Sequence, residues 1–395
     1  MVATAMQLYL FIYGCLALGH IALQLVLGHV DYVLDRRRWP RDPRSPRLVT
    51  VVVPVYNEDP SALRACLESI RRQDHGRLEV IVVDDGSSNR GEHEAVYAEF
   101  DAPGWSILRE PENRGKREAQ KLAFDRARGE LLVTIDSDTI LRTPDAIRKI
   151  QRRFADPRVG AVTGNVAVAN REDNVLTRLI GYRYWMAFHQ ERAAQSLFGV
   201  VMCASGPFAA YRSSIVAAVK DDYVAQRFLG KRCTFGDDRH LTNLVLARGH
   251  RVVFDREARA GTHVPANLRD YLRQQTRWNK SFYREILWTL RFAHRRHPYL
   301  AVELLLQATL PLMLLTAVES VLLRALLSDP AHVAGYLAVV AGIAATRTAY
   351  GMLRTRDLGF LLFVAYGFVH LGLMIPTRLY ALATIGRAHW GTRDV

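Results

Sequence analysis

Two aspartates separated by one residue follow an apolar run and have the spacing of a metal site. Asp136 and Asp138 flank Ser137 directly after the run ELLVTI. Alternate residues at the end of a strand can direct both carboxylates towards one ion, and such hard oxygen ligands suit Mg²⁺ or Mn²⁺. The ion would neutralise the charge that develops on a departing diphosphate. The alternative interpretation is a simple turn or helix cap.

A second acidic pair and a nearby lysine are suited to bind a nucleotide. Asp84 and Asp85 follow the run LEVIVV and precede Gly86, which permits a tight turn and close approach of a ligand. Their carboxylates could accept hydrogen bonds from a uracil ring or a ribose. Lys116, in the polar turn NRGK, could approach the base or the phosphates. It could equally be a solvated surface lysine.

The motif GDDRH precedes a helical pattern and supplies a candidate general base. Asp237 or Asp238 could merely cap that helix. Sugar transfer with inversion, however, needs one carboxylate that deprotonates the acceptor hydroxyl. A hydrolase would need a second acid for the leaving group, whereas a metal-bound diphosphate leaves without one. Either aspartate could be this base or contact substrate, and we expect His240 to be structural rather than catalytic.

The motif QQTRW lies in a basic, aromatic, amphipathic stretch over residues 268–292. Such a stretch is typical of a helix at a membrane surface, with its aromatic rings at the level of the headgroups. The same helix could present Gln274, Arg277 and Trp278 to an active site, because aromatic faces also stack on sugar rings. The two interpretations are compatible.

The elements that would carry these residues alternate between strand and helix from residue 48 onwards. Buried β-branched runs separated by helical patterns predict an α/β domain with a mostly parallel sheet and helices on both faces. In such sheets, ligands bind beyond the carboxyl ends of the strands. The first strand ends near Tyr56 and Glu58, which we therefore also expect to contact substrate.

Apolar runs at both ends of the chain predict membrane segments. Residues 7–30 contain no Lys, Arg, Asp or Glu and are enough to span a bilayer as an uncleaved anchor. The basic stretch 36–47 that follows places the next domain in the cytoplasm. Three more apolar stretches cover about 299–327, 332–350 and 358–385. Glu303 would face a cavity or lie at the membrane interface, and these alternatives stay open.

The third of these stretches contains Pro376 and is followed by several arginines. We expect it to form a re-entrant or kinked hairpin that returns to the cytoplasmic side, because arginines favour that side. The expected parts are an anchor (1–34), a cytoplasmic catalytic domain (35–265), interfacial helices (266–297), a transmembrane or re-entrant region (298–385) and a cytoplasmic tail (386–395).

Composition narrows the class of partner. The 395-residue chain is long enough for one soluble domain with membrane segments, and it carries a net charge of +14. Much of the arginine lies beside apolar runs, where lipid headgroups would attract it, and no nucleic-acid motif accompanies it. The four cysteines have no metal spacing and suggest no disulfide framework, so we expect the main domain to face a reducing compartment.

Taken together, the motifs resemble those of the processive family 2 glycosyltransferases, the group that contains hyaluronan, chitin and cellulose synthases. The resemblance covers most of the chain and rests on VDDGS, NRGKR, DSD, CASGP, GDDRHL, QQTRW and WGTR. It implies a GT-A fold, UDP-sugar donors, inverting transfer, a plasma-membrane location and export of the polymer through the enzyme's own membrane segments.

The resemblance also implies roles for individual residues. Asp84 and Asp85 would bind uridine with Lys116 nearby, and Asp138, assisted by Asp136, would hold the metal. Asp238 would be the general base. The loop that binds the acceptor would contain Cys203, Ser205, Gly206 and Pro207. The acceptor sugar and the donor diphosphate would be held by Gln274, Arg277 and Trp278. The donor pocket would be gated by a segment that contains Trp390 and Arg393.

The product is the open question. WGTR and the residues after QQTRW favour a hyaluronan synthase that uses UDP-GlcNAc and UDP-GlcA, which is our main prediction. GDDRHLTNLVL and the single N-terminal anchor favour the alternative, a chitin-oligosaccharide synthase that uses only UDP-GlcNAc. The expected partners are UDP-sugars, a growing polysaccharide and the bilayer, with no obligatory protein partner. A non-catalytic nucleotide-binding channel or receptor is the remote alternative.

Overall fold

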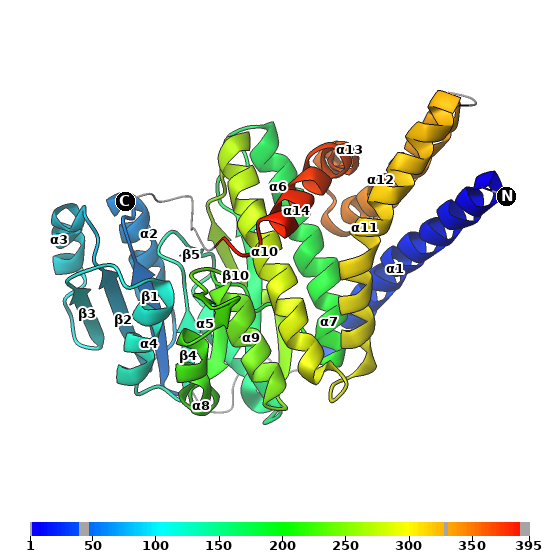
Figure 1. Cartoon of the computed structure of the whole chain (residues 1–395). Helices are drawn as coiled ribbons and strands as arrows, with labels where there is room; N and C mark the ends of the chain where they lie inside the picture. The colour runs from blue at the N-terminus through cyan, green and yellow to red at the C-terminus, as the bar shows by residue number, and fades with distance from the viewer. Residues whose placement is uncertain (1, 39–46, 328–330, 388–395) are drawn as a thin grey trace.

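A computed structural model describes residues 2–38, 47–327 and 331–387 of the chain. It consists of an α/β domain and a set of long helices that project from one side of it (Figure 1). Helix α10 (Leu268–Ala293) lies between the two parts.

One eight-stranded sheet forms the centre of the α/β domain, with the strand order β3-β2-β1-β4-β7-β6-β10-β5. Strands β3, β2, β1 and β4 are parallel neighbours, whereas β7 runs antiparallel to both β4 and β6. The strands are β1 (Val49–Val55), β2 (Leu78–Asp85), β3 (Trp105–Glu110), β4 (Leu131–Thr134), β5 (Ile140–Leu141), β6 (Val159–Val168), β7 (Ala209–Arg212) and β10 (Arg251–Thr262). A separate hairpin pairs β8 (Arg227–Phe228) with β9 (Lys231–Arg232).

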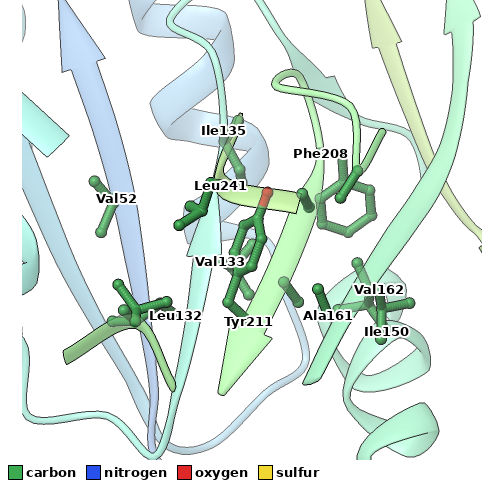
Figure 2. Packing of buried hydrophobic residues seen from close by; sticks show 14 of the residues in the cluster. Val52, Leu132, Val133, Ile135, Ile150, Ala161, Val162, Phe208, Tyr211 and Leu241 are labelled. Carbon is green, nitrogen blue, oxygen red and sulfur yellow. The ribbon is translucent and has the colours of Figure 1, made fainter. Parts of the chain in front are cut away.

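The central strands are buried on both faces, as their β-branched sequences predict. Every residue of β1 and of β4 is buried. Figure 2 shows Val52, Leu132 and Val133 of these strands packed in one cluster with Phe208 and Tyr211. This core fixes the positions of the strand ends at which the candidate site lies.

Helices cover both faces of the sheet and follow the strands in alternation (Figure 1). They are α2 (Pro60–Arg71), α3 (Arg90–Glu99), α4 (Lys116–Arg126), α5 (Ala146–Arg152) with a 3₁₀ turn (Arg153–Ala155), α8 (Ser213–Val224) and α9 (Asp237–Ala247). Helix α6 (Val175–Met186) continues through a π-helical segment (Ala187–Arg192) into α7 (Ala193–Phe198). The α/β fold with a mostly parallel sheet is confirmed.

Four helices of the described chain are long and apolar enough to cross a membrane: Gln7–Asp35, Pro298–Leu323, Tyr336–Thr355 and Leu358–Ala383. They belong to α1 (Val2–Arg38), α11 (Pro298–Leu327), α12 (Ala331–Thr355) and a final helical run. The final run comprises a 3₁₀ segment (Leu358–Leu362), α13 (Phe363–Val369), a π segment (His370–Met374) and α14 (Ile375–Ala383). The predicted number of apolar stretches is therefore confirmed.

The predicted hairpin within the last stretch is wrong, because the chain stays helical from Leu358 to Ala383. Pro376 lies in the first turn of α14, directly after the π segment. A proline is tolerated at the start of a helix, and the wider π turn absorbs the local change in hydrogen bonding. Pro376 therefore changes the helix type without reversing the chain.

Buried ion pairs tie the N-terminal helix to the α/β domain. Asp31 lies 2.6 Å from Arg256 of β10, and Asp35 lies 2.6 Å from Arg153 after α5. Arg153 also contacts the fully buried Asp255 at 2.5 Å. Because breaking a buried pair leaves an uncompensated charge, α1 is held firmly in place on the domain.

Glu303 is also buried, between α1 and α11. Its carboxylate accepts hydrogen bonds from Gln24 at 2.7 Å and from Gln307 at 2.6 Å, and it lies 3.0 Å from the Nε2 atom of His20. Only 1% of its surface is exposed. Glu303 itself does not line the cavity that was expected, but three of its partners, His20, Gln24 and Gln307, do.

Candidate active site

The acidic turns predicted to share one edge of the sheet do so. Strands β1, β2 and β4 are parallel neighbours, and the turns that follow them meet at their carboxyl ends. The Oε2 atom of Glu58, after β1, accepts a hydrogen bond of 2.6 Å from the hydroxyl of Ser137, after β4. Asn57 adopts a left-handed conformation with φ of 47°, which asparagine tolerates, and its Oδ1 atom accepts a bond from the Ser88 amide. Tyr56 is half-buried beside them.

Asp85 joins the turn after β2 to the turn that carries Lys116. Its two oxygens accept hydrogen bonds from the backbone amides of Arg114 and Gly115, at 2.9 and 2.8 Å. Gly86, which has φ of +70°, packs so closely that a Cβ atom there would overlap the backbone of Glu112. The motifs VDDGS and NRGK thus form one structural unit, and helix α4 begins at Lys116.

Asp84 is fully buried, which does not fit direct contact with a nucleotide. Its carboxylate accepts hydrogen bonds from the hydroxyl of Tyr97 at 2.7 Å, the amide of Ser87 at 2.8 Å and the guanidinium of Arg90 at 3.2 Å. Burial alone would raise the pKa of Asp84, but these bonds lower it below its usual value. In this structure Asp84 shapes the turn in which Asp85 lies.

The ammonium of Lys116 lies between two of the candidate carboxylates. Its Nζ atom is 2.6 Å from Oδ1 of Asp136 and 3.1 Å from Oδ2 of Asp237. Burial disfavours the ammonium, but the two carboxylates outweigh it and raise the pKa of Lys116 well above its usual value. Lys116 is therefore charged, and the alternative of a solvated surface lysine is wrong.

Asp136 and Asp138 have the alternating arrangement that their spacing predicts. Both are half-buried, while Ser137 between them is buried. Asp138 accepts a hydrogen bond of 3.3 Å from the Thr262 hydroxyl at the end of β10. Within the described ranges, no three His, Cys, Asp or Glu side chains are grouped to hold a metal. Asp136 and Asp138 offer two hard carboxylate ligands, although Asp136 already pairs with Lys116. The two carboxylates fit a divalent ion whose other ligands would come from a molecule bound beside them.

Asp238 is the second residue of α9 and contacts the loop that carries CASGP. Its Oδ2 atom lies 3.3 Å from the Cys203 thiol and 3.4 Å from the Gly206 amide, both of which donate to it. Ser205 of the same loop accepts a hydrogen bond from Arg192, and Pro207 is half-buried. The structure therefore brings the predicted base and the predicted acceptor loop together.

The surroundings of Asp238 favour a proton acceptor. Burial, together with the charge of the neighbouring Asp237, raises the pKa of Asp238 above its usual value. A raised pKa makes a carboxylate a stronger base as long as it remains ionised at the working pH. Burial also raises the pKa of the Cys203 thiol to about 12, so this thiol stays protonated and can donate to Asp238.

Helix α10 presents part of the QQTRW motif to the same region. Trp278 is 45% exposed, and its ring lies 6.4 Å from the ring of Tyr184 on α6. Burial is the largest cause that raises the pKa of the Tyr184 phenol. The negative charges of Asp138, Asp136 and Asp238 raise it further. The Oε1 atom of Gln274 is buried and has no hydrogen-bond partner, so it is able to bind a ligand. Arg277 is half-buried.

A cavity of about 430 Å³ begins beside Trp278 and Arg239 and continues among the long apolar helices. Side chains from every one of the long helices line it, including Tyr13, His20, Gln24, Arg183, Glu191, Arg239, Trp278, Gln307, Arg347, Tyr366, His370 and Arg378. Charged, amide and aromatic side chains share this lining with many aliphatic ones, so the cavity presents both polar and apolar surface.

Several residues of the site were not predicted. Tyr184 and Arg192 come from α6 and the π segment, which carry no recognisable turn or strand-end signal. Arg239 follows Asp238 directly, and its place in GDDRH could have drawn attention to it. Trp390 and Arg393, the predicted gating residues, lie outside the described residues.

Residues 50–219 match the model of the family described as glycosyl transferase family 2. Among curated proteins, the chain is 40% identical over 351 residues to an N-acetylglucosaminyltransferase of Sinorhizobium fredii, covering 88% of this chain and 84% of the relative. It is also 40% identical over 357 residues to an N-acetylglucosaminyltransferase of Rhizobium meliloti, covering 90% and 83% respectively.

Among solved structures, the chain is similar to a mannosyltransferase from Pyrobaculum calidifontis in complex with GDP-mannose and Mn²⁺. The TM-score is 0.66, the identity is 22%, and the match covers 95% of this chain and 98% of the other. At this identity the likeness supports the fold alone.

Proposed function

Because this chain is a glycosyltransferase of family 2, we propose that it transfers N-acetylglucosamine from UDP-N-acetylglucosamine to a growing oligosaccharide, as a chitin-oligosaccharide synthase does. The observation that carries the proposal is the 40% identity, over 88% of the chain, to proteins named N-acetylglucosaminyltransferase. That coverage extends well beyond the 50–219 segment that matches the family as a whole. It favours the alternative product over hyaluronan, which was the main prediction.

The chemistry follows from the positions of the carboxylates. Asp238 takes the proton from the acceptor hydroxyl, whose oxygen attacks the anomeric carbon of the donor sugar. The bond between that carbon and the diphosphate oxygen breaks, and UDP leaves. The Gly206 amide and the Cys203 thiol keep the Asp238 carboxylate oriented towards the acceptor. Attack from the face opposite the leaving group inverts the anomeric configuration.

We propose that a divalent cation binds at Asp138 and Asp136. The fit rests on two half-buried hard carboxylates at the carboxyl edge of the sheet. The mannosyltransferase of similar fold was solved with Mn²⁺, which is compatible with a divalent ion in a protein of this fold. Such an ion supplies charge neutralisation for the diphosphate. Lys116, which already contacts Asp136, adds a second positive charge on the same side.

The growing chain is proposed to leave through the cavity between the membrane helices. Trp278 lines this cavity and lies beside Tyr184, so a sugar ring stacked on Trp278 would stand between the carboxylates and the cavity. The four candidate spans and the basic segment 36–47 support a plasma-membrane protein whose catalytic domain faces the cytoplasm.

A second product, hyaluronan, is favoured by one observation. Among the described residues that line the cavity, Glu191 is the only acidic one, whereas Arg183, Arg239, Arg347 and Arg378 are all cationic. Glu191 pairs with Arg183 at 3.0 Å and with Arg347 at 3.4 Å. The remaining positive charge would suit a polymer that carries carboxylates, such as one containing glucuronate.

The experiment that separates the products supplies donors singly and together. Purified protein in detergent is incubated with Mg²⁺ or Mn²⁺ and with UDP-GlcNAc, UDP-GlcA or both, and released UDP is measured. The proposal predicts sustained release with UDP-GlcNAc alone and no increase when UDP-GlcA is added. A strict need for both donors would support hyaluronan instead. Absence of turnover with any UDP-sugar would favour the nucleotide-binding channel or receptor.

A further inference from the structure

We propose that Arg284 and Glu285 of α10 are positioning residues, which transmit the position of this helix to the base Asp238 and to the donor-binding turn at Lys116. The inference rests on the proposed function, because it assigns these two side chains a role in sugar transfer. Both residues lie in the amphipathic stretch shortly after QQTRW, and the sequence analysis gave neither of them a role of its own. Both are buried, at 7% and 1% exposure.

The first link is the backbone directly before Asp237 and Asp238. The carbonyl oxygen of Phe235 accepts a hydrogen bond of 2.5 Å from Nη2 of Arg284 and one of 3.3 Å from Nη2 of Arg117. Gly236 follows with φ of +76°, and a Cβ atom there would overlap the hydroxyl of Ser281 on α10. The start of α9 is thus held between a guanidinium from α10 and one from α4.

The second link is a carboxylate that balances these cations. Glu285 accepts hydrogen bonds from Gln226 at 2.6 Å, from Asn243 at 3.1 Å and from Arg284 at 3.3 Å, and it lies 3.1 Å from Nδ1 of His240. Burial alone would raise the pKa of Glu285, but its hydrogen bonds, with that to His240 foremost, hold it at about 2. The carboxylate therefore remains ionised and is fully hydrogen-bonded.

The third link leads from Glu285 back to the donor side. Gln226, which donates to Glu285, accepts a hydrogen bond of 2.8 Å from Nη2 of Arg117. Arg117 also donates to the carbonyl of Tyr223 at 3.0 Å. Arg117 directly follows Lys116, the residue that bridges Asp136 and Asp237. The network therefore connects α10, the turn before α9 and the first turn of α4.

This connection has a mechanical consequence. Helix α10 is a single rigid element that carries Gln274 and Trp278 near one end and Arg284 and Glu285 further along. A shift of α10 that accompanies acceptor binding would move the Phe235 carbonyl and hence Asp238. Because a misplacement of about 1 Å can cost on the order of 100-fold in rate, small shifts of this helix affect the chemical step.

The test compares variants that change the network with one that does not. Arg284→Lys keeps the charge but replaces the planar guanidinium, whose Nε and Nη2 atoms donate separately to Glu285 and Phe235, with a single nitrogen. The double variant Arg284→Gln with Glu285→Gln removes both charges together, so that no buried charge is left unpaired. Arg291→Gln, at an exposed position of the same helix, is the matched control. For each protein we would measure kcat, KM for UDP-GlcNAc, the Kd for UDP by calorimetry and the pH dependence of kcat.

We expect kcat to fall about 10- to 100-fold in both network variants, while the Kd for UDP changes less than about threefold. The acid limb of the pH profile should also move, because the surroundings of Asp238 change. A merely structural role would lower the melting temperature and the active fraction without moving that limb. Suppose that the wild-type enzyme is active and that either variant keeps both the wild-type kcat and the wild-type acid limb. That result would overturn this inference and leave the proposed function standing. An inactive wild-type enzyme would instead overturn the proposed function.

Discussion

The Nζ atom of Lys116 lies 2.6 Å from the Oδ1 atom of Asp136. This contact joins the turn after β3 to the turn after β4, and the same ammonium reaches Asp237 at 3.1 Å. A charged amine thus occupies the space between two carboxylates that are separated by about a hundred residues of sequence. It neutralises part of the acidic cluster and would compete with a metal ion bound at Asp136.

Replacement of Lys116 by methionine should therefore strengthen metal binding in the absence of nucleotide. We expect the affinity for Mn²⁺ alone, measured by electron paramagnetic resonance, to rise roughly threefold or more, because Asp136 loses its competing cation. Transfer should nevertheless fall. Lys121→Met, on the same helix but paired with Asp125, should leave both quantities unchanged. Unchanged Mn²⁺ affinity in Lys116→Met would show that the ion does not use Asp136.

Replacement of Asp238 by asparagine should remove the base and leave the donor site intact. Asparagine has nearly the same shape, so the CASGP loop should keep its position, but the amide cannot accept the acceptor's proton. We expect UDP release from UDP-GlcNAc to fall about 10²- to 10⁴-fold, while the affinity for UDP stays within about threefold. Asp221→Asn, at an exposed position, is the control. Retention of full turnover would rule out Asp238 as the base.

The pH dependence of transfer should reflect the raised pKa of Asp238. Burial and the charge of Asp237 raise this pKa above the ordinary value of 3.8. Because the base acts when deprotonated, activity should be lost as the pH falls through the raised value. Asp237→Asn removes the neighbouring negative charge, so the acid limb of the kcat profile should move to lower pH. A limb that moves to higher pH would contradict this electrostatic description.

The close packing of Gly86 should make it intolerant of any side chain. In Gly86→Ala, the new methyl group would overlap the Glu112 backbone, and the residue would have to keep φ of +70°. We expect the free energy of unfolding to fall by about 2 kcal/mol or more, together with a loss of UDP binding. Gly91→Ala, in α3 with no atom within 4 Å of the new Cβ, should be neutral or stabilising. Equal thermal stability of the two variants would contradict the packing described here.

The buried carboxylate of Glu303 should matter for the attachment of α1. Glu303→Leu would leave the amides of Gln24 and Gln307 without their acceptor, at a cost of about 1–3 kcal/mol for each unpaired group. We therefore expect a lower melting temperature of the purified protein in detergent. Glu303→Gln, which keeps an acceptor oxygen, should lose less. Glu319→Leu, at an exposed position of the same helix, is the control. Identical melting of Glu303→Leu and Glu319→Leu would contradict a structural role for Glu303.

The sheet and its acidic edge could be predicted because their signals are local. The β-branched run of β1 is buried along its whole length, and the runs before Asp84 and Asp136 form β2 and β4 as expected. The burial of Asp84 could not be predicted, since its partners Arg90 and Tyr97 come from a helix whose docking depends on tertiary packing.

Two further features depend on contacts between distant segments. The bond from Arg284 to the Phe235 carbonyl joins residues 49 positions apart, and no spacing rule indicates it. Pro376 was expected to break the last apolar stretch, but the π segment before it keeps the chain helical. Sequence patterns describe single elements well, whereas the packing of one element on another decides which polar groups become buried.

The central claim is that this enzyme builds an oligosaccharide from N-acetylglucosamine alone. It is tested most directly by mass spectrometry of the material that purified protein makes from UDP-GlcNAc with Mg²⁺ or Mn²⁺ and no other donor. We predict a series of oligosaccharides that differ by one N-acetylhexosamine and that a chitinase degrades. Product that forms only after UDP-GlcA is added, and that alternates the two sugars, would contradict the claim.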